Sequence, residues 1–210
     1  LLIDNNKEFK VKDLISYSVS LHRDQGLELS NEKLQKELTE FLLNRLRYYM
    51  KEKKIRADII DASIDSYGID HLNKIYKKAS ILNNLINTEI WLDIITSYKR
   101  ASSILDSELK INDLVLSNTT DSGIFKNDYE KNLLKKINEL RKYFKNINKD
   151  EDYMQSLINL SVAKKVIFEF FDNVKVNDQD KNIKKNRLEL LQMLCRTFNN
   201  YINFSNIETK

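Results

Sequence analysis

The scarcity of residues that interrupt helices is the strongest constraint on the fold of this chain. Its 210 residues include three glycines and no proline. Sheet proteins built on tight hairpins need many more of both, because glycine and proline supply the backbone angles of their turns. Apolar residues recur at helical spacing through most of the chain. The sequence therefore predicts an all-α fold, a bundle of about seven to nine helices.

The spacing of the apolar residues also predicts where these helices lie. The expected ranges are 11–24, 31–53, 56–66, 70–86, 88–106, 128–147, 151–174 and 180–202. Residues 107–126 are rich in Ser, Asn, Thr and Asp and include Gly123, so we expect a loop there. No change of composition separates two domains, and we expect residues 1–210 to form a single one.

Composition argues against several classes of protein. One cysteine excludes an internal disulfide and fits a reducing compartment; Cys195 lies on an apolar helix face and is predicted to be a packed thiol. No apolar run approaches the ~18 residues of a membrane span, so we expect no membrane partner. With His22 and His71 as the two histidines, the usual zinc ligand sets cannot be assembled. Three glycines can hardly form a phosphate-binding loop, and we predict a chain without catalytic residues.

The charge of the chain is mildly basic, at a formal +4. The basic residues crowd three stretches, 44–56, 131–149 and 181–187, while the acidic residues scatter. A basic stretch is either a solvated helix face or a surface that binds the phosphates of a nucleic acid. Charge alone leaves both interpretations open.

The C-terminal part of the chain has the most specific pattern. Residues 166–207 contain, in order, Phe170-Phe171-Asp172, Val174, Val176, Asn186-Arg187-Leu188 and Asn203-Phe204-Ser205. This order resembles the C-terminal, DALR-type anticodon-binding domain of the β subunit of bacterial glycyl-tRNA synthetase. Segments 41–47, 55–62 and 93–105 are similar to other helices of that domain, and residues 1–10 to its join with the preceding part of the β subunit. The chain departs from the family pattern at Phe168, Lys175, Lys184 and Asn203.

The resemblance implies a cytoplasmic, helical anticodon-binding domain with three partners: tRNA(Gly), the synthetase α subunit and the remainder of the β subunit. It also implies that ATP and magnesium serve the holoenzyme, a glycine–tRNA ligase whose chemistry lies in the α subunit, and that this chain binds no cofactor. An alternative is a helical scaffold that assembles the subunits without reading RNA. The related domain of arginyl-tRNA synthetase shares the fold but lacks the Asn203-Phe204-Ser205 ending, and we rank it lower.

A helical wheel of the last helix indicates which of its charges support the fold. Arg187 falls near the middle of the apolar stripe, Lys184 lies close to that stripe, and Asn186 points away from it. An unpaired buried charge costs several kcal/mol, so a buried arginine needs a carboxylate. We expect Arg187 to pair with Asp172.

The same wheel, applied to residues 31–53, places Arg45 among the apolar residues. We expect Arg45 to pair with Asp58 or Asp61, or to line a cleft, while Arg47 projects from the opposite face. Cations on outer faces are available for phosphates, and an exposed tyrosine can stack on an unpaired base. The predicted RNA-binding residues are Arg47, Tyr48, Lys51, Lys99, Arg100 and Lys184.

Overall fold

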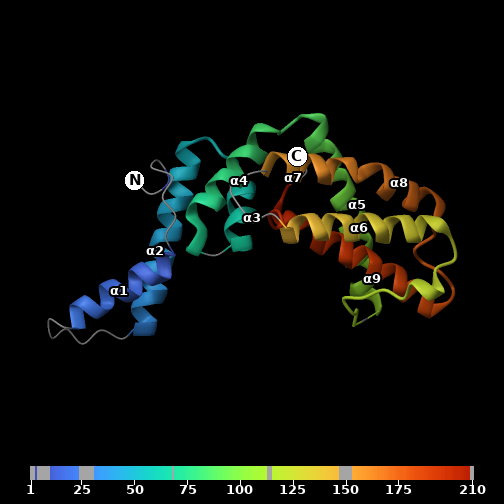
Figure 1. Ribbon diagram of the computed structural model, residues 1–210, viewed down its shortest axis with the longest axis horizontal. Coiled ribbons are helices and arrows are strands. Elements are labelled where there is room, and N and C mark those ends of the chain that lie inside the picture. The colour runs from blue at the N-terminus through green and yellow to red at the C-terminus, as the bar shows by residue number, and fades with distance from the viewer. Residues whose placement is uncertain are drawn as a thin grey trace. The chain divides into compact units, whose positions relative to one another are not determined.

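The computed structural model describes residues 3, 10–23, 31–67, 69–112, 115–146 and 153–208, and within these ranges the fold is all-α (Figure 1). The described residues contain no strand, which confirms the predicted fold class. Most of residues 1–10, the predicted join, lie outside the described ranges. None of the described helices is both long enough and apolar enough to cross a membrane.

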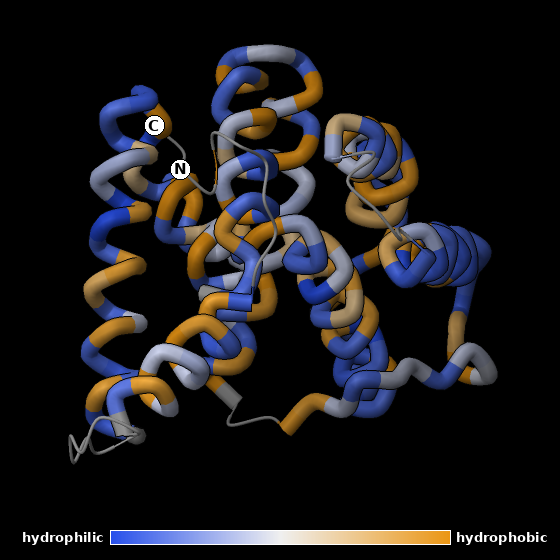
Figure 2. The backbone as a smooth tube through the Cα atoms, turned by 60° about the vertical axis from the view of Figure 1, so that its left-hand side comes forward, coloured by the Kyte–Doolittle hydropathy of each residue, from blue (hydrophilic) through white to orange (hydrophobic). Residues whose placement is uncertain are grey.

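The chain divides into two compact units. The first comprises Leu1–Asn84 together with Asn206–Glu208, and the second comprises Leu85–Ser205. The expectation of a single domain stays a prediction, because compactness does not establish whether the units fold or act separately. Figure 2 shows hydrophobic and hydrophilic residues alternating along most of the helices, as expected for helices that bury one face.

The first unit contains α1 (Val11–Arg23), α2 (Asn31–Glu52), α3 (Ala57–Tyr67), η1 (Ile69–His71) and α4 (Leu72–Asn84). Val11, Ile15 and Val19 recur every four residues on α1 and are all buried. Leucines of α2 and Leu72 of α4 pack against them. The other face of α1 is exposed.

The end of α2 is a Schellman motif with a lysine where glycine is usual. Lys54 has a φ of 60°, in the left-handed region. The N–H of Ile55 donates to the carbonyl of Met50 at 3.1 Å, and the N–H of Lys54 donates to that of Lys51 at 2.9 Å. Ile55 and Met50 are both buried, so an apolar contact accompanies the two hydrogen bonds. This motif ends α2 and directs the chain into α3.

The C-terminal residues 206–208 belong to the first unit through contacts near the start and near the end of α3. The N–H of Glu208 donates to Asp58 Oδ2 at 2.8 Å, and the Arg56 guanidinium donates to the Glu208 carbonyl at 2.9 Å. Asn206 donates to Asp65 at 2.5 Å. Arg56 also pairs with Asp58. Burial alone raises the pKa of Asp58, but these donors outweigh burial and lower it overall.

The second unit contains α5 (Glu89–Asn112), η2 (Ser122–Ile124), α6 (Asp128–Asn146), α7 (Tyr153–Val162), α8 (Lys164–Asn173), α9 (Lys181–Phe198) and the start of η3 (Phe204–Asn206). Both α5 and α6 pack against α9, and α8 packs against α6. Near the end of α9, the rings of Tyr98, Phe198, Tyr201 and Phe204 contact one another, with neighbouring centroids 5.7–6.5 Å apart. This aromatic cluster closes one end of the core.

Three boundaries differ from the sequence prediction. Helix α5 continues to Asn112, so the expected loop at 107–126 begins later than predicted. The predicted helix 151–174 is two helices, because the chain turns at Val162–Ala163, where the Ala163 N–H donates to Leu160 and not to a residue four positions back. Helix α9 ends at Phe198, and residues 199–203 form turns. Most of the remaining boundaries agree within about two residues.

Cys195 provides a test of the core around α9. Its side chain is buried, and burial raises the pKa of its thiol to about 12. Because the thiolate is the reactive form, we expect Cys195 to react with a disulfide reagent at pH 8 far more slowly than a free thiol. The reaction is followed by absorbance, with the guanidinium-unfolded chain as the control that releases one equivalent. Rapid reaction of the folded chain would contradict the packing described.

Candidate nucleic-acid interface

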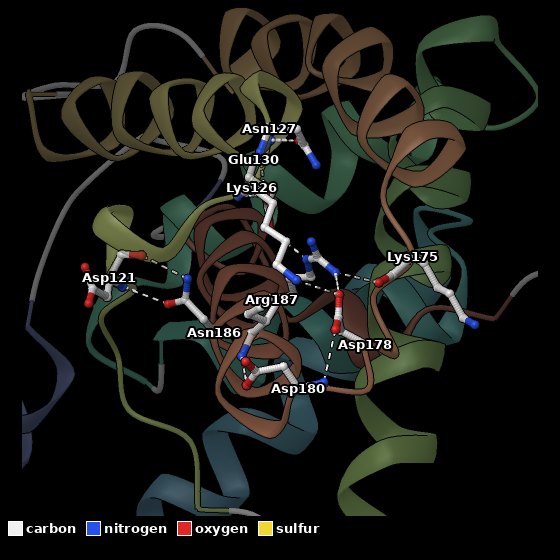
Figure 3. Close-up of polar contacts among 10 residues, drawn as sticks. Asp121, Lys126, Asn127, Glu130, Lys175, Asp178, Asp180, Asn186 and Arg187 are labelled. Carbon is white, nitrogen blue, oxygen red and sulfur yellow. Dashed lines mark hydrogen bonds and ion pairs between the residues drawn. The ribbon is translucent and has the colours of Figure 1, made fainter.

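A buried arginine lies at the centre of the second unit, and three segments meet at it (Figure 3). Arg187 of α9 is 4% exposed, and its Nε lies 2.7 Å from Glu130 Oε1. Its Nη1 lies 2.8 Å from Asp178 Oδ2 and donates to the Lys175 carbonyl, also at 2.8 Å. Arg187 thereby joins α9 to α6 and to the turn that precedes α9.

The Glu130 carboxylate contacts both the start of α6 and Arg187 of α9. Its Oε2 accepts the N–H groups of Lys126 at 2.7 Å and Asn127 at 3.1 Å, while its own N–H donates to Asn127 Oδ1 at 3.1 Å. This reciprocal arrangement is a capping box at the first turn of α6. The other oxygen, Oε1, holds Arg187. A single buried carboxylate thus starts α6 and attaches that start to α9.

Two further polar residues of α9 hold the segment between α5 and α6. Asn186 Oδ1 accepts the Asp121 N–H at 2.7 Å, and Asn186 Nδ2 donates to the Asp121 carbonyl at 2.9 Å. Glu189 Oε1 accepts the N–H of Ser117 at 3.0 Å and its hydroxyl at 2.8 Å. The prediction that Asn186 points away from the core is wrong, because it is 4% exposed. Its amide pairs with backbone that a wheel of α9 alone does not include.

The predicted pair between Arg187 and Asp172 is also wrong, although the predicted burial of Arg187 is confirmed. Asp172 is exposed near the end of α8 and lies 3.4 Å from Arg100. The Arg100 guanidinium lies 5.1 Å from the centroid of the Phe168 ring and 4.6 Å from that of Phe171. The wheel of its helix predicted that Arg100 points outward. In the structure its guanidinium instead contacts Asp172 and the two phenylalanine rings of α8.

The apolar stripe predicted on α2 is confirmed at Leu34, Leu38 and Leu42, which pack against α1, but not around Arg45. Leu46 and Met50 are the most buried of the described α2 residues, whereas Phe41, an apolar neighbour of Arg45 in the wheel, is 57% exposed. Arg45 is consequently exposed, with its guanidinium 5.8 Å from the Phe41 centroid, and among the described residues it forms no ion pair with Asp58 or Asp61. Asp61 instead binds Arg47, at 3.0 Å. Arg47, and not Arg45, therefore forms the ion pair with Asp61.

The other predicted RNA-binding residues differ in how far they are engaged within the protein. Lys184 is largely buried and lies 2.6 Å from Glu108 of α5. Tyr48 is 59% exposed, Lys51 is exposed, and Lys99 is half-buried on α5. Tyr48 and Lys51 belong to the first unit and Lys99 to the second, so the predicted set is not one cluster.

A groove in the second unit includes basic residues that the residue-level prediction missed. It runs along the outer face of α6, beside η2, and has a volume of about 480 Å³. Its lining consists of Ser122, Phe125, Lys131, Leu134, Lys135, Asn138, Glu139 and Lys142. The basic stretch 131–149 was the available signal in the sequence. The contribution of Phe125 was not visible there, because it depends on how the preceding segment folds against α6.

Comparison with known proteins shows the family of this chain. Residues 94–210 match the model of the DALR anticodon binding domain. The chain belongs to this family. The β subunit of glycine–tRNA ligase from Rickettsia prowazekii is 32% identical over 204 residues, which are 97% of this chain and 28% of that protein. The corresponding subunit from Persephonella marina is 31% identical over 181 residues, 85% of this chain and 24% of that protein. The chain thus spans about a quarter of the length of these relatives.

The buried ion pair predicts a large difference in stability between two substitutions, one at Arg187 and one at Asp172. Arg187→Ala leaves Glu130 buried without its cation, and we expect it to lower the free energy of unfolding by about 3–5 kcal/mol. Asp172→Ala is the matched control, and removing this exposed carboxylate should cost less than about 1 kcal/mol. Urea unfolding followed by circular dichroism measures both. Equal losses for the two variants would contradict the assignment of the partner.

The lowered pKa of Asp178 predicts how the stability of the fold depends on pH. The Asp180 N–H that donates to it lowers its pKa in the folded chain, and Lys126 and Arg187 lower it further. A carboxylate whose pKa is lower folded than unfolded stabilises the fold above about pH 4, and this contribution is lost as the pH falls through the folded pKa. The Asp178→Asn variant should therefore have a lower free energy of unfolding than wild type at neutral pH. The difference between the two free energies, the stability gap, should become smaller in acid. Urea unfolding at a series of pH values measures the gap, and a constant gap would contradict the prediction.

Proposed function

We propose that this chain binds the anticodon arm of tRNA(Gly) as part of the β subunit of a glycine–tRNA ligase. The observation that carries the proposal is the family match over residues 94–210, the region that contains the buried Arg187 cluster and the α6 groove. Relatives named as the β subunit of this ligase align with nearly the whole chain, which supports a shared role for both compact units. We include the single-domain organisation in this proposal.

The mechanism that fits these residues is positioning of the RNA. Lysines and arginines on outer helix faces bind phosphates, and exposed aromatic rings stack on unpaired bases. Tyr48 and Lys51 of α2 and Lys99 of α5 remain candidates for such contacts. Arg47, Arg100 and Lys184 already contact carboxylates, so RNA binding by these three requires sharing or exchange of the partner.

The bond-forming chemistry belongs to other parts of the holoenzyme in this proposal. ATP and magnesium bind outside this chain, and the attachment of glycine belongs to the holoenzyme, whose adenylate chemistry lies in the α subunit. Among the described residues, no group of histidine, cysteine and carboxylate side chains is arranged to hold a metal ion. We place the chain in the cytoplasm, because aminoacyl-tRNA is consumed there by protein synthesis.

A second candidate function is assembly of the synthetase. On α1, Leu14, Tyr17 and Leu21 are 41%, 64% and 46% exposed and follow the spacing of one helix face. An exposed apolar stripe of this kind is typical of a surface that contacts another protein. The α subunit and the remainder of the β subunit are the partners that we propose for it.

Salt dependence of RNA binding tests the proposed function. With on the order of five phosphate contacts to unpaired RNA, the logarithm of the association constant should fall with the logarithm of salt concentration at a slope of about −3 to −4. Filter binding of the 210-residue chain to tRNA(Gly) measures the slope, and a tRNA with another anticodon is the control. Absence of binding at low salt, or equal binding to both tRNAs, would favour the assembly function.

A further inference from the structure

The α6 groove combines an apolar floor with a cationic rim. Phe125 and Leu134 are half-buried and line the floor, whereas Lys135 and Lys142 are exposed. Lys131, Lys135, Asn138 and Lys142 follow the spacing of one helix face, so their side chains lie along the same side of α6. The volume of about 480 Å³ falls in the range of about 300–1,000 Å³ that is usual for ligand sites.

The charge on this side of α6 is neutralised only in part within the described part of the chain. The helix has six cationic residues and three carboxylates. Glu130 is buried with Arg187, Asp128 pairs with Lys131 at 2.9 Å, and Glu139, which also lines the groove, lies 3.5 Å from Lys136. Within the described residues, Lys135 and Lys142 form no ion pair. An anionic ligand is therefore the complement of the groove.

The wall opposite α6 is fixed in place before any ligand arrives. Asp121 Oδ1 accepts the Gly123 N–H at 2.8 Å, and the Asp121 backbone is held by both ends of the Asn186 amide. The start of α6 is held by Glu130 and Arg187. Phe125 lies between these two attachments. Little conformational freedom in this wall remains to be lost on binding, which favours affinity.

An aromatic residue beside lysines fits an unstacked nucleotide. In a duplex the faces of the bases are covered by their neighbours, whereas an unpaired base can lie against an aromatic ring. The carboxylates of an acidic peptide would satisfy the lysines, but they present no flat ring to Phe125, whereas every nucleotide carries both a phosphate and a base.

We propose that the α6 groove binds an unpaired nucleotide of the anticodon loop, with the base against Phe125 and Leu134 and the neighbouring phosphates on Lys135 and Lys142. This inference rests on the proposed function, since it assigns the RNA contact to particular residues. It places the RNA contacts on a surface that does not include the family pattern Asn186-Arg187-Leu188.

Two variants and a matched control test the groove. The double variant Lys135→Gln, Lys142→Gln removes two phosphate contacts, and it should flatten the salt slope by about 1.4. Phe125→Leu keeps an apolar floor but removes the ring, and it should weaken binding at least about fivefold, while Phe125→Tyr retains binding. Lys165→Gln removes an exposed lysine of α8 outside the groove and should behave as wild type. Thermal melts check that each variant is folded.

Filter binding uses the 210-residue chain with the anticodon stem-loop of tRNA(Gly), and a continuous duplex of the same stem is the comparison RNA. The inference is supported if the groove variants lose affinity for the stem-loop and the Lys165 variant does not. It is overturned, with the proposed function intact, if wild type binds the stem-loop and all variants bind equally well. Equal losses on the duplex would also overturn it, because a duplex presents no unpaired base. If wild type binds neither RNA, the proposed function fails, and the groove inference fails with it.

Discussion

The second unit depends on the neutralisation of one buried arginine. Arg187 lies in an apolar helix face, where an isolated charge is unfavourable by several kcal/mol, and two carboxylates and a carbonyl surround it. These partners come from α6 and from the turn before α9. Neither segment can move away from α9 without leaving a charge unpaired. The arginine therefore specifies which segments meet, while the surrounding apolar residues supply most of the burial.

The polar residues of α9 also determine where the proposed RNA surface lies. Through Arg187, α9 holds the start of α6, and through Asn186 and Glu189 it holds the segment that leads to η2. Those two elements form the walls of the groove. The pattern Asn186-Arg187-Leu188, which resembles the family in the sequence, thus has a structural role. Its polar side chains position the groove that we propose to bind RNA. In the proposed function, residues on the outer helix faces make the contacts to the RNA.

Much of the fold followed from the sequence, because helical periodicity and the lack of glycine and proline are local properties. The burial of Arg187 and of Cys195 followed too, since both lie in the apolar stripe of a single helix. The partner of Arg187 did not follow, because Glu130 is 57 residues away and only the packing of α6 on α9 brings it near. On α2 the wheel failed for another reason. Apolar residues occur at positions 41, 42, 43, 46, 48, 49 and 50, so more than one stripe fits the pattern, and only contact with α1 and α3 selects the one through Leu46 and Met50.

Two sets of cations in this chain differ in their distance from the apolar stripes. Arg187, Lys184 and Arg47 lie in or beside a stripe, and each contacts a carboxylate because its charge is at least partly withdrawn from water. Lys135 and Lys142 lie opposite the buried face of α6, where water solvates an unpaired charge at little cost. A phosphate can replace that water without breaking an internal ion pair. For this reason we assign the proposed RNA contact to a basic run on the outer face of an amphipathic helix, whereas a cation within a stripe indicates how the helices are held together.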